Sequence, residues 1–570
     1  MKKLQLTLAL VIGLLMMIPA QSIAQKTTLT ISEKMLMHHE QPEDPYMPNE
    51  WKNHKTGPAY HVRNSIFFST QVNVDEDGEN IFGDAANEPS IGIDPVNPLR
   101  MVIGWRQFDN VSSNFRQAGY AYTEDGGETW IFPGSINPGV FRSDPVLDTD
   151  STGRFYYNSL TVDNQSNYTC DVFRNQEGSF VWDEGTDAQG GDKQWMVIDR
   201  TGSAGDGNVY SFWTNFYSIC YPGNFTRSVD GGASYEDCVP VESEPYWGTL
   251  AVGSAGELYI VGAGQFGGLT FVKSTGAVNP KYPVSWDFSV QVDIGGELSG
   301  WTDINPAGLL GQAYIAVDNS GGPGEGYIYV LASVDPVSGP DPANVMFARS
   351  TDGGLSWDAP VKINDDATNN KYQWFGTMSV APNGRIDAIW LDNRDASSGS
   401  FLSSLYYAYS MDQGETWSVN ERLSDGFDPH VGWPNQEKMG DYFHMVSDNE
   451  SAHLAWCGTF NSEQDVYYGR ITPLITAIPD LPEVADLMNI SCSPNPFSGT
   501  TSVRYFVPVE AKVNITLFDV YGKAVKTIVD EQKLPGNYSV QITSDQIAKG
   551  TFLCRLSIGE NRRTTRIIHF

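Results

Sequence analysis

The sequence predicts an all-β protein in which most strands belong to repeated units and the last strands form a small C-terminal β-sandwich. Three observations favour this class. Among the 570 residues, 56 are Gly and 12% are aromatic, a composition typical of strands joined by tight turns. One short motif occurs four times in the middle of the chain. Pairs of strand-like segments occur at and between these copies.

The recurring motif has the pattern S/T-x-D-x-G-x-S/T-W/Y and the chemistry of a hairpin turn. Its carboxylate accepts backbone N–H bonds inside the turn, and its Gly supplies a positive φ. The Asp and the closing aromatic residue of the four copies are Asp125 and Trp130, Asp230 and Tyr235, Asp352 and Trp357, and Asp412 and Trp417. The motif resembles the Asp-box, or BNR repeat. We therefore expect a structural role on the outer hairpin of each unit, away from a ligand face.

The spacing of the motif predicts further units that lack it. The intervals between the four Asp residues are 105, 122 and 60 residues, and an interval near 60 corresponds to one unit. Strand pairs fill the gaps at 90–94 with 101–105, 144–150 with 154–160, 195–199 with 209–213, 248–252 with 257–261, 313–318 with 327–332, 377–381 with 385–391, and 441–447 with 452–456. The last unit is one strand short, and residues 60–74 alternate in polarity as a strand would. This pattern predicts a seven-bladed β-propeller over residues 59–475 that closes its ring with an N-terminal strand; six blades are the alternative.

The N-terminus reads as a secretory signal. Lys2 and Lys3 precede an apolar run over residues 4–20, and small residues follow at 22–24, so we expect a signal peptide at 1–24. A membrane anchor is the alternative, because the run is at the lower limit for spanning. Residues 25–58 would then be an N-terminal extension, and no later segment is apolar enough to span.

The C-terminal segment differs in composition from the rest of the chain. A Pro-containing linker is expected at 476–487, and residues 488–570 contain ten Lys or Arg against six Asp or Glu. Three short motifs resemble the type IX secretion C-terminal sorting domain of Bacteroidetes. They are Ser-Pro-Asn-Pro-Phe at 493–497, Tyr-Gly-Lys at 521–523 and Lys-Gly-Thr-Phe at 549–552. The resemblance implies contact of residues 488–570 with the type IX secretion machinery, and a final location at the cell surface or in the medium. An immunoglobulin-like accessory domain is the alternative.

Charge and cysteine content exclude several classes of protein. The formal charge of −33 disfavours nucleic acids and anionic membranes as partners, because both require a basic surface. Six Cys in 570 residues are too few for a disulfide scaffold. In an oxidising compartment Cys220 and Cys238 are the best pair, because they flank one expected hairpin. Cys492 and Cys554 are the next, which leaves Cys170 and Cys457.

Candidate ligand residues lie where innermost strands begin and where the loop after each second strand returns. Carboxylates, basic groups and aromatic rings converge there, and paired carboxylates carry out glycosidic acid/base chemistry while aromatic rings stack on sugars. The candidate catalytic residues are Asp144, Asp392, Glu437 and Asp441. The candidate substrate-binding residues are Trp105, Arg106, Lys193, Trp195, Trp213, Trp374, Arg394 and Tyr442, and Glu88, Asp192 and Lys438 lie at the same strand starts.

The Asp-boxes, with segments such as Ser-Asp-Pro at 143–145 and Met-Gly-Asp-Tyr at 439–442, make the middle of the chain similar to the sialidase superfamily. The resemblance implies a propeller and a sialidase-like glycoside hydrolase, in which Arg106, Arg394 and Arg142 are candidates for an anion clamp. The early F/Y-R-I-P motif of sialidases is absent. Two hypotheses therefore stay open: a secreted glycoside hydrolase, or a non-catalytic propeller that binds a glycan or a protein.

Cofactors find little support in the sequence. None of the eight His has zincin spacing. Residues 148–153 and 75–78 resemble calcium loops, with ordinary Asp/Gly turns as the alternative reading. We predict no metal at the ligand face and leave structural calcium as an open hypothesis.

Overall fold

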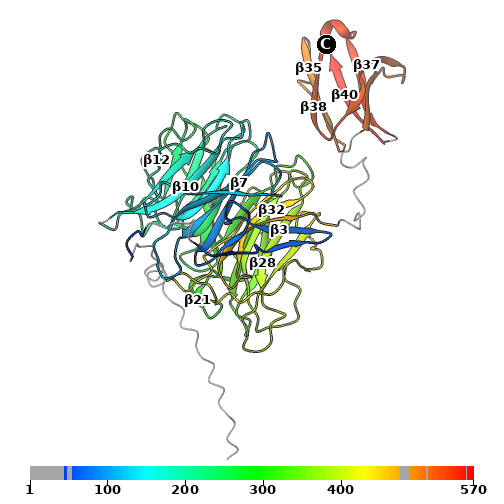
Figure 1. Ribbon diagram of the computed structural model, residues 1–570. Coiled ribbons are helices and arrows are strands. Elements are labelled where there is room, and N and C mark those ends of the chain that lie inside the picture. The colour runs from blue at the N-terminus through cyan, green and yellow to red at the C-terminus, as the bar shows by residue number, and fades with distance from the viewer. Residues whose placement is uncertain (1–43, 48–53, 164, 475–487, 509–510, 560) are drawn as a thin grey trace, which may run out of the picture. The chain divides into compact units, whose positions relative to one another are not determined.

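The computed structural model describes residues 44–47, 54–163, 165–474, 488–508, 511–559 and 561–570 (Figure 1). Its elements are almost all antiparallel strands, which confirms the all-β class. The predicted signal peptide, most of the N-terminal extension and the predicted linker lie outside the described residues. No helix in the described ranges has the length and apolar character needed to cross a membrane.

Seven sheets in the described residues share one plan, in which consecutive strands pair from the inside outwards. They are β5 (Ala85–Ile93), β6 (Met101–Phe108), β7 (Gln117–Thr123) and β8 (Ile131–Ile136); β9 (Ser143–Thr149), β10 (Phe155–Val162), β11 (Tyr168–Arg174) and β12 (Thr186–Asp187); β13 (Trp195–Ile198), β14 (Val209–Phe212) and β15 (Phe225–Ser228); β16 (Tyr246–Val252), β17 (Leu258–Ala263), β18 (Leu269–Ser274) and β19 (Phe288–Val292); β23 (Tyr314–Val317), β24 (Ile328–Pro336), β25 (Asn344–Ser350) and β26 (Val361–Lys362); β27 (Gln373–Val380), β28 (Ile386–Asp392), β29 (Ser404–Ser410) and β30 (Glu421–Arg422); and β31 (His444–Ser447), β32 (Ala452–Gly458) and β33 (Asp465–Ile471) with β3 (Phe67–Gln71) and β2 (His61–Arg63). The first two strands of each sheet match the predicted strand pairs.

The innermost strands form a closed ring. Contacts run from β5 to β9, β13, β16, β23, β27 and β31, and from β31 back to β5. The N-terminal strand β3 pairs with β33, with Phe67 opposite Ile471 and Gln71 opposite Tyr467, and Figure 1 shows the blue β3 beside strands of the yellow region. The predicted closing strand is confirmed, and it hides the free edge that β33 would otherwise expose. A ring of radially arranged sheets is the β-propeller architecture.

Apolar side chains fill the space between neighbouring sheets and hold the ring together. The strands β6, β14, β17, β28 and β32 are buried along their whole length. Sheets on two sides cover such strands, so they read as continuous apolar runs rather than alternating patterns.

One hairpin between the fourth and fifth sheets was not predicted. Its strands β21 (Gly300–Thr302) and β22 (Asn305–Leu309) pair with each other, and the short β20 (Gly296–Glu297) joins the outer end of β24. Two further short strands, β1 (Thr56–Gly57) and β4 (Asn80–Ile81), pair before the first sheet. The residues of β21 and β22 are rich in Gly and polar side chains, so they lack the apolar alternation that signals a strand.

The C-terminal module is a sandwich of two antiparallel sheets with a core of its own. One sheet has the order β34 (Ile490–Ser493), β35 (Thr500–Val507), β38 (Gly536–Thr543), and the other has the order β37 (Ala524–Lys533), β36 (Ala511–Phe518), β39 (Gly550–Ile558), β40 (Asn561–His569); a single 3₁₀ turn, η2, spans Ser544–Gln546. The sequence pattern predicts strands at 501–506, 513–519, 536–543 and 550–557, and these correspond to β35, β36, β38 and β39. The strands β37 and β40 were missed because most of their side chains are polar or exposed.

The structure joins Cys220 and Cys238 by a disulfide, with 6.1 Å between their Cα atoms. The second expected pair is not a disulfide, because Cys492 and Cys554 are both thiols. The thiols of Cys170 and Cys457 are buried.

Candidate functional site

Seven charged side chains at the predicted ligand face meet in one buried cluster, which we call the ion network. Its members are Glu88, Arg106, Asp144, Asp192, Lys193, Lys438 and Asp441. Every one of these side chains is at most 2% exposed. The sequence therefore predicted their convergence, but the structure seals them from solvent.

Two lysines bridge the carboxylates of the ion network. The Nζ of Lys193 lies 2.8 Å from Oδ2 of Asp144 and 2.9 Å from Oδ2 of Asp441. The Nζ of Lys438 lies 2.7 Å from the same Asp441 oxygen and 3.2 Å from Oε1 of Glu88. Arg106 completes the group, with Nη2 3.3 Å from Glu88 Oε1. The carboxylates are thus neutralised by ammonium and guanidinium groups rather than paired across an open pocket.

Burial and charge divide the acids of the ion network into two kinds. Desolvation raises the pKa of Glu88 to about 8 and that of Asp192 to about 7. Burial also acts on Asp144, but the neighbouring Lys193 and Arg106 hold the pKa of that carboxyl below its ordinary value. Although burial opposes the charge of Lys193, Asp144 and Asp441 raise the pKa of its ammonium well above the usual range. Asp144 is therefore a fixed counter-ion of Lys193 at neutral pH.

A repeated backbone feature aims these side chains at the ring axis. Glu88, Asp144 and Lys193 all have a positive φ, of 50°, 48° and 56°, near the start of an innermost strand. The register of β5 and of β9 against its partner shifts at this point. A β-bulge of this kind bends the strand and redirects a side chain. Sequence pattern alone does not show such a bulge, because the residues involved are not Gly.

The hairpin of β21 and β22 closes over the ion network. The backbone N–H of Leu309 donates to Oδ1 of Asp441 at 2.8 Å. The Asn305 side chain donates to the Gly440 carbonyl at 2.9 Å and accepts from the Met439 N–H at 2.9 Å. None of the four predicted residues Arg106, Asp144, Lys193 and Asp441 reaches solvent in the structure. The predicted roles, catalytic for Asp144 and Asp441 and substrate-binding for Arg106 and Lys193, stay predictions.

The predicted catalytic residues Asp392 and Glu437 are not members of the ion network. Asp392 is 1% exposed, and its oxygens accept bonds from the Arg394 backbone N–H at 2.7 Å, Arg394 Nε at 2.8 Å and Trp390 Nε1 at 2.9 Å. Arg394 also binds Asp365. Glu437 is exposed. Asp392 therefore positions Arg394 and has no face turned to a substrate.

The expected anion clamp of three arginines is not formed. Arg106 pairs with Glu88, Arg142 pairs with Asp171 at 2.6 Å, and Arg394 pairs with Asp392. Each guanidinium has its own carboxylate partner, so the three do not share one anion.

The predicted sugar-stacking aromatic residues serve packing. Trp105, Trp213 and Trp374 have no exposed surface. Tyr442 is 1% exposed and donates its hydroxyl to the Pro145 carbonyl at 2.9 Å. Trp195 lies on the ring axis, edge-on to Tyr314, Tyr442 and His444 with ring centroids 5.3–5.6 Å apart. Their role as substrate platforms stays a prediction, and the burial of these rings does not favour it, because a ring buried on both faces cannot stack on a sugar.

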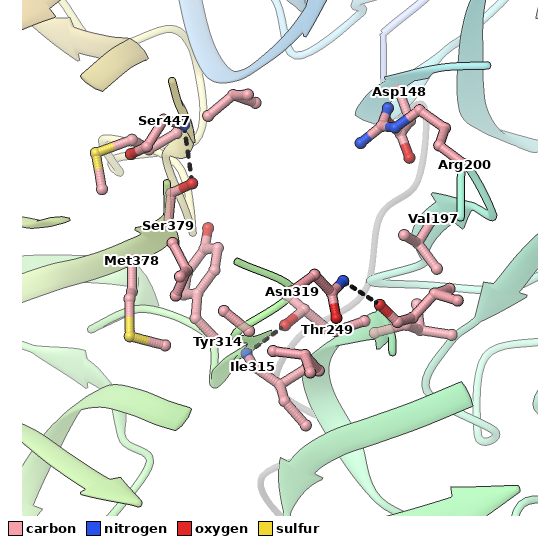
Figure 2. A pocket seen from close by; sticks show the side chains of 18 of the residues that line it. Asp148, Val197, Arg200, Thr249, Tyr314, Ile315, Asn319, Met378, Ser379 and Ser447 are labelled. Atoms are coloured by element: carbon pink, nitrogen blue, oxygen red, sulfur yellow. Dashed lines mark hydrogen bonds and ion pairs between the residues drawn. The ribbon is translucent and has the colours of Figure 1, made fainter. Parts of the chain in front are cut away.

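A cavity of about 600 Å³ opens on the other side of this aromatic layer (Figure 2). It is lined by the second halves of innermost strands and by the turns that follow them. The first Asp-box hairpin lies at the same end of the innermost strands, since Gly126 donates its N–H to the carbonyl of Leu99, which lies in the turn after β5. In Figure 2 the ion pair of Asp148 and Arg200 lies across the cavity from Ser379 and Ser447. Sequence reasoning missed this site, because it placed ligands only at the opposite end of the strands.

The four Asp-boxes share one hydrogen-bond geometry. In the third box, Oδ1 of Asp352 accepts the Ser350 hydroxyl and the Ser356 N–H, each at 2.9 Å, and Oδ2 accepts the Ser356 hydroxyl at 2.6 Å. The corresponding bonds of Asp125, Asp230 and Asp412 have the same donors and lengths between 2.6 and 3.0 Å. The closing Trp357 packs on Phe271 of the preceding sheet, with 5.3 Å between the ring centroids. The boxes thus join neighbouring sheets.

The loops that resemble calcium sites use their carboxylates internally. Oδ1 of Asp150 accepts the N–H groups of Thr152 and Arg154, and Oδ1 of Asp75 accepts those of Asp77 and Glu79. Within the described ranges, no group of three or more His, Cys, Asp or Glu side chains is placed to hold a metal ion.

Comparison with known families identifies the C-terminal module. Residues 492–569 match the model of the secretion system C-terminal sorting domain. The protein therefore carries a type IX sorting signal and is exported to the cell surface or secreted. A search of curated proteins found no match.

Several solved structures are similar to the chain at low identity. A protein of unknown function from Dyadobacter fermentans is 13% identical, with 72% of this chain and 98% of that chain covered and a TM-score of 0.41. A Trypanosoma rangeli sialidase is 8% identical, with 89% of each chain covered and a TM-score of 0.36. The GH93 alpha-L-arabinofuranosidase of Fusarium graminearum is 8% identical, with 68% of this chain and 93% of that chain covered and a TM-score of 0.27. The propeller assignment above depends on the sheet topology and not on these scores.

Proposed function

We propose that the protein is a secreted, non-catalytic propeller that binds a glycan outside the cell. The observation that carries this proposal is the state of the predicted catalytic carboxylates. Asp144 and Asp441 share the Lys193 ammonium, so their bound oxygens are less than about 6 Å apart. This upper limit alone does not exclude the separation of about 5–10 Å between glycosidase carboxyl groups. Hydrolysis also needs a proton donor and a base that touch the substrate. Here both groups are buried, neutralised and capped.

The cavity on the Asp-box side supports the same conclusion. Its lining contains one carboxylate, that of Asp148. Acid/base hydrolysis of a glycoside uses two. The cavity has the size of a small-molecule site, and hydroxyl, amide and aliphatic groups surround it, which suits a sugar without providing the groups to cleave it.

A glycan array and a chromogenic-glycoside screen of the purified mature chain test the proposal together. We expect saturable binding to at least one glycan and no turnover of any glycoside. Asp392→Asn and Asp441→Asn serve as variants at the two sites with predicted catalytic carboxylates. Turnover by the wild type that either substitution abolishes would overturn the non-catalytic assignment, and a complete absence of glycan binding would overturn the glycan partner.

A further inference from the structure

The cavity of about 600 Å³ on the Asp-box side of the ring has the form of a cup with a closed floor, and we call it the cup. Trp195 and Tyr314 are only 4% exposed and form the floor together with His444. The wall comes from side chains at one repeated position, two residues before the turn that ends each innermost strand. In six consecutive sheets these residues are Asp148, Val197, Ala251, Ala316, Ser379 and Val446. Small residues at this position leave the 600 Å³ open.

The charges inside the cup cancel. Arg200 forms an ion pair with Asp148 and donates to the Thr149 carbonyl at 2.7 Å. The lining contains two more titratable side chains, Tyr314 and His444. Burial raises the pKa of the Tyr314 phenol, so it carries no charge at neutral pH. Nδ1 of His444 lies 2.9 Å from the Ser90 hydroxyl, and burial lowers the pKa of this imidazole to about 4. The imidazole is therefore neutral at pH 7. The lining offers no unbalanced cation to a carboxylated or phosphorylated ligand.

The polar groups of the cup lie around its rim, and the aliphatic ones lie between them. The Arg200 side chain is 38% exposed and that of Asp148 is 15% exposed, so both present donor and acceptor atoms to the cavity while they remain paired. Figure 2 shows Asn319 and Ser379 on other sides of the same space. Polar groups beside C–H surfaces such as those of Val197 and Ala316 suit a sugar, which has both hydroxyl groups and C–H bonds.

We infer that this cup, at the Asp-box end of the ring axis, binds the terminal residue of a neutral saccharide. The inference rests on the proposed glycan-binding function and specifies its site and ligand class. An acidic sugar is disfavoured twice, because the Arg200 charge is already neutralised and residues 25–487 carry an excess of acidic side chains.

Titration calorimetry of the mature chain with neutral and sialylated oligosaccharides tests the site. Ala316→Trp fills the cup, and Val419→Trp places the same side chain at an outer position that is 78% exposed. We expect Ala316→Trp to weaken binding of the neutral saccharide at least 30-fold, while Val419→Trp leaves it unchanged. Arg200→Met, on the rim, should weaken binding about tenfold. This variant tests the site without placing a bulky indole in the cup.

The outcomes separate the site from the function. If the wild type binds saccharides and both Ala316→Trp and Arg200→Met bind as tightly, the cup is not the site, although the glycan-binding function stands. Preference for sialylated over neutral saccharides would overturn the ligand class. If no saccharide binds the wild type, the proposed function itself fails.

Discussion

Single buried acids give the propeller a dependence on pH that can be measured. Asp465 is fully buried at the start of β33, and its Oδ1 accepts a bond from Asn73 at 2.9 Å. Burial raises the pKa of this carboxyl to about 8, with Glu463 adding to the effect and Asn73 opposing it. Because the folded state keeps a proton that the unfolded chain loses near pH 4, the stabilising contribution of this group falls as pH rises from about 4 to 8.

Asp465→Asn removes this titration and keeps the shape of the side chain. We expect the free energy of unfolding of the variant, relative to that of the wild type, to rise by about 1 kcal/mol for each pH unit between 5 and 7. Above pH 8 this difference should become constant. Chemical denaturation at several pH values measures it. Asp77→Asn in an exposed turn is the control. Parallel pH profiles for wild type and Asp465→Asn would contradict the assignment.

At the same scale, the sequence predicted the Asp-boxes in full and the ligand face only in part. The box residues interact within seven positions, so local pattern determines their geometry. The convergence of Asp144 and Asp441 was also predictable from strand order. Lys193 was predicted at the same face as a substrate ligand. Its ion pairs with both carboxylates were not predicted, because strand order places residues at one end of the ring but does not give side-chain contacts such as the 2.9 Å between Lys193 and Asp441.

The Asp-box hairpin is the element that fits one sheet against the next. Gly354 has a φ of +94°, and a Cβ added there would lie 2.1 Å from Cε1 of Phe271 on the preceding sheet. Gly339 has a φ of +97° with nothing within 4 Å. An Ala would be strained by the positive φ at both positions, but a clash of its Cβ is expected only at position 354.

Substitution by Ala at these two glycines measures the packing of the box. Gly339→Ala should lower the free energy of unfolding by about 1–2 kcal/mol through strain alone. Gly354→Ala should lower it by about 1–3 kcal/mol more, because an aromatic ring must move. Equal losses in thermal or chemical denaturation would show that the box does not depend on close contact with the neighbouring sheet.

The hairpin of β21 and β22 is the element that decides whether the ion network meets water. Asn305 holds it with bonds to Leu309, Gly440 and Met439. Asn305→Ala should speed hydrogen exchange of the amides at 300–309 at least tenfold. Thr302→Ala on the same hairpin removes a hydroxyl that makes no hydrogen bond in the structure and should leave the exchange unchanged. Similar exchange rates in both variants would mean that Asn305 does not hold the cap.

The whole molecule combines a ring that closes on itself with a separately cored C-terminal module. The strand pairs, the closing strand and the sandwich were predictable, because apolar periodicity and turn residues are local signals. The unpredicted parts are the bulges at strand starts and the capping hairpin. Both depend on contacts across the ring axis, and both convert the predicted open mouth into a sealed one. This is why the fold followed from the sequence, while the binding site that we propose lies at the opposite end of the channel from the predicted one.

The domain boundaries at 59, 475 and 488 remain predictions, since the linker lies outside the described residues. The match of residues 492–569 to the secretion system sorting domain shows that the protein is exported. The glycan binding that we propose is therefore assigned to the propeller, because the C-terminal module matches a sorting domain.

The most direct test of the non-catalytic assignment is product analysis with the glycan that the protein binds. The mature chain is incubated with that glycan, in excess over its dissociation constant and at pH values from 5 to 8, and released sugars are quantified by chromatography. We predict that the glycan is recovered intact at every pH, because Asp144, Asp392 and Asp441 do not reach it. Release of sugar by the wild type, lost in Asp441→Asn or Asp144→Asn, would show that the ion network opens and acts as a catalytic site.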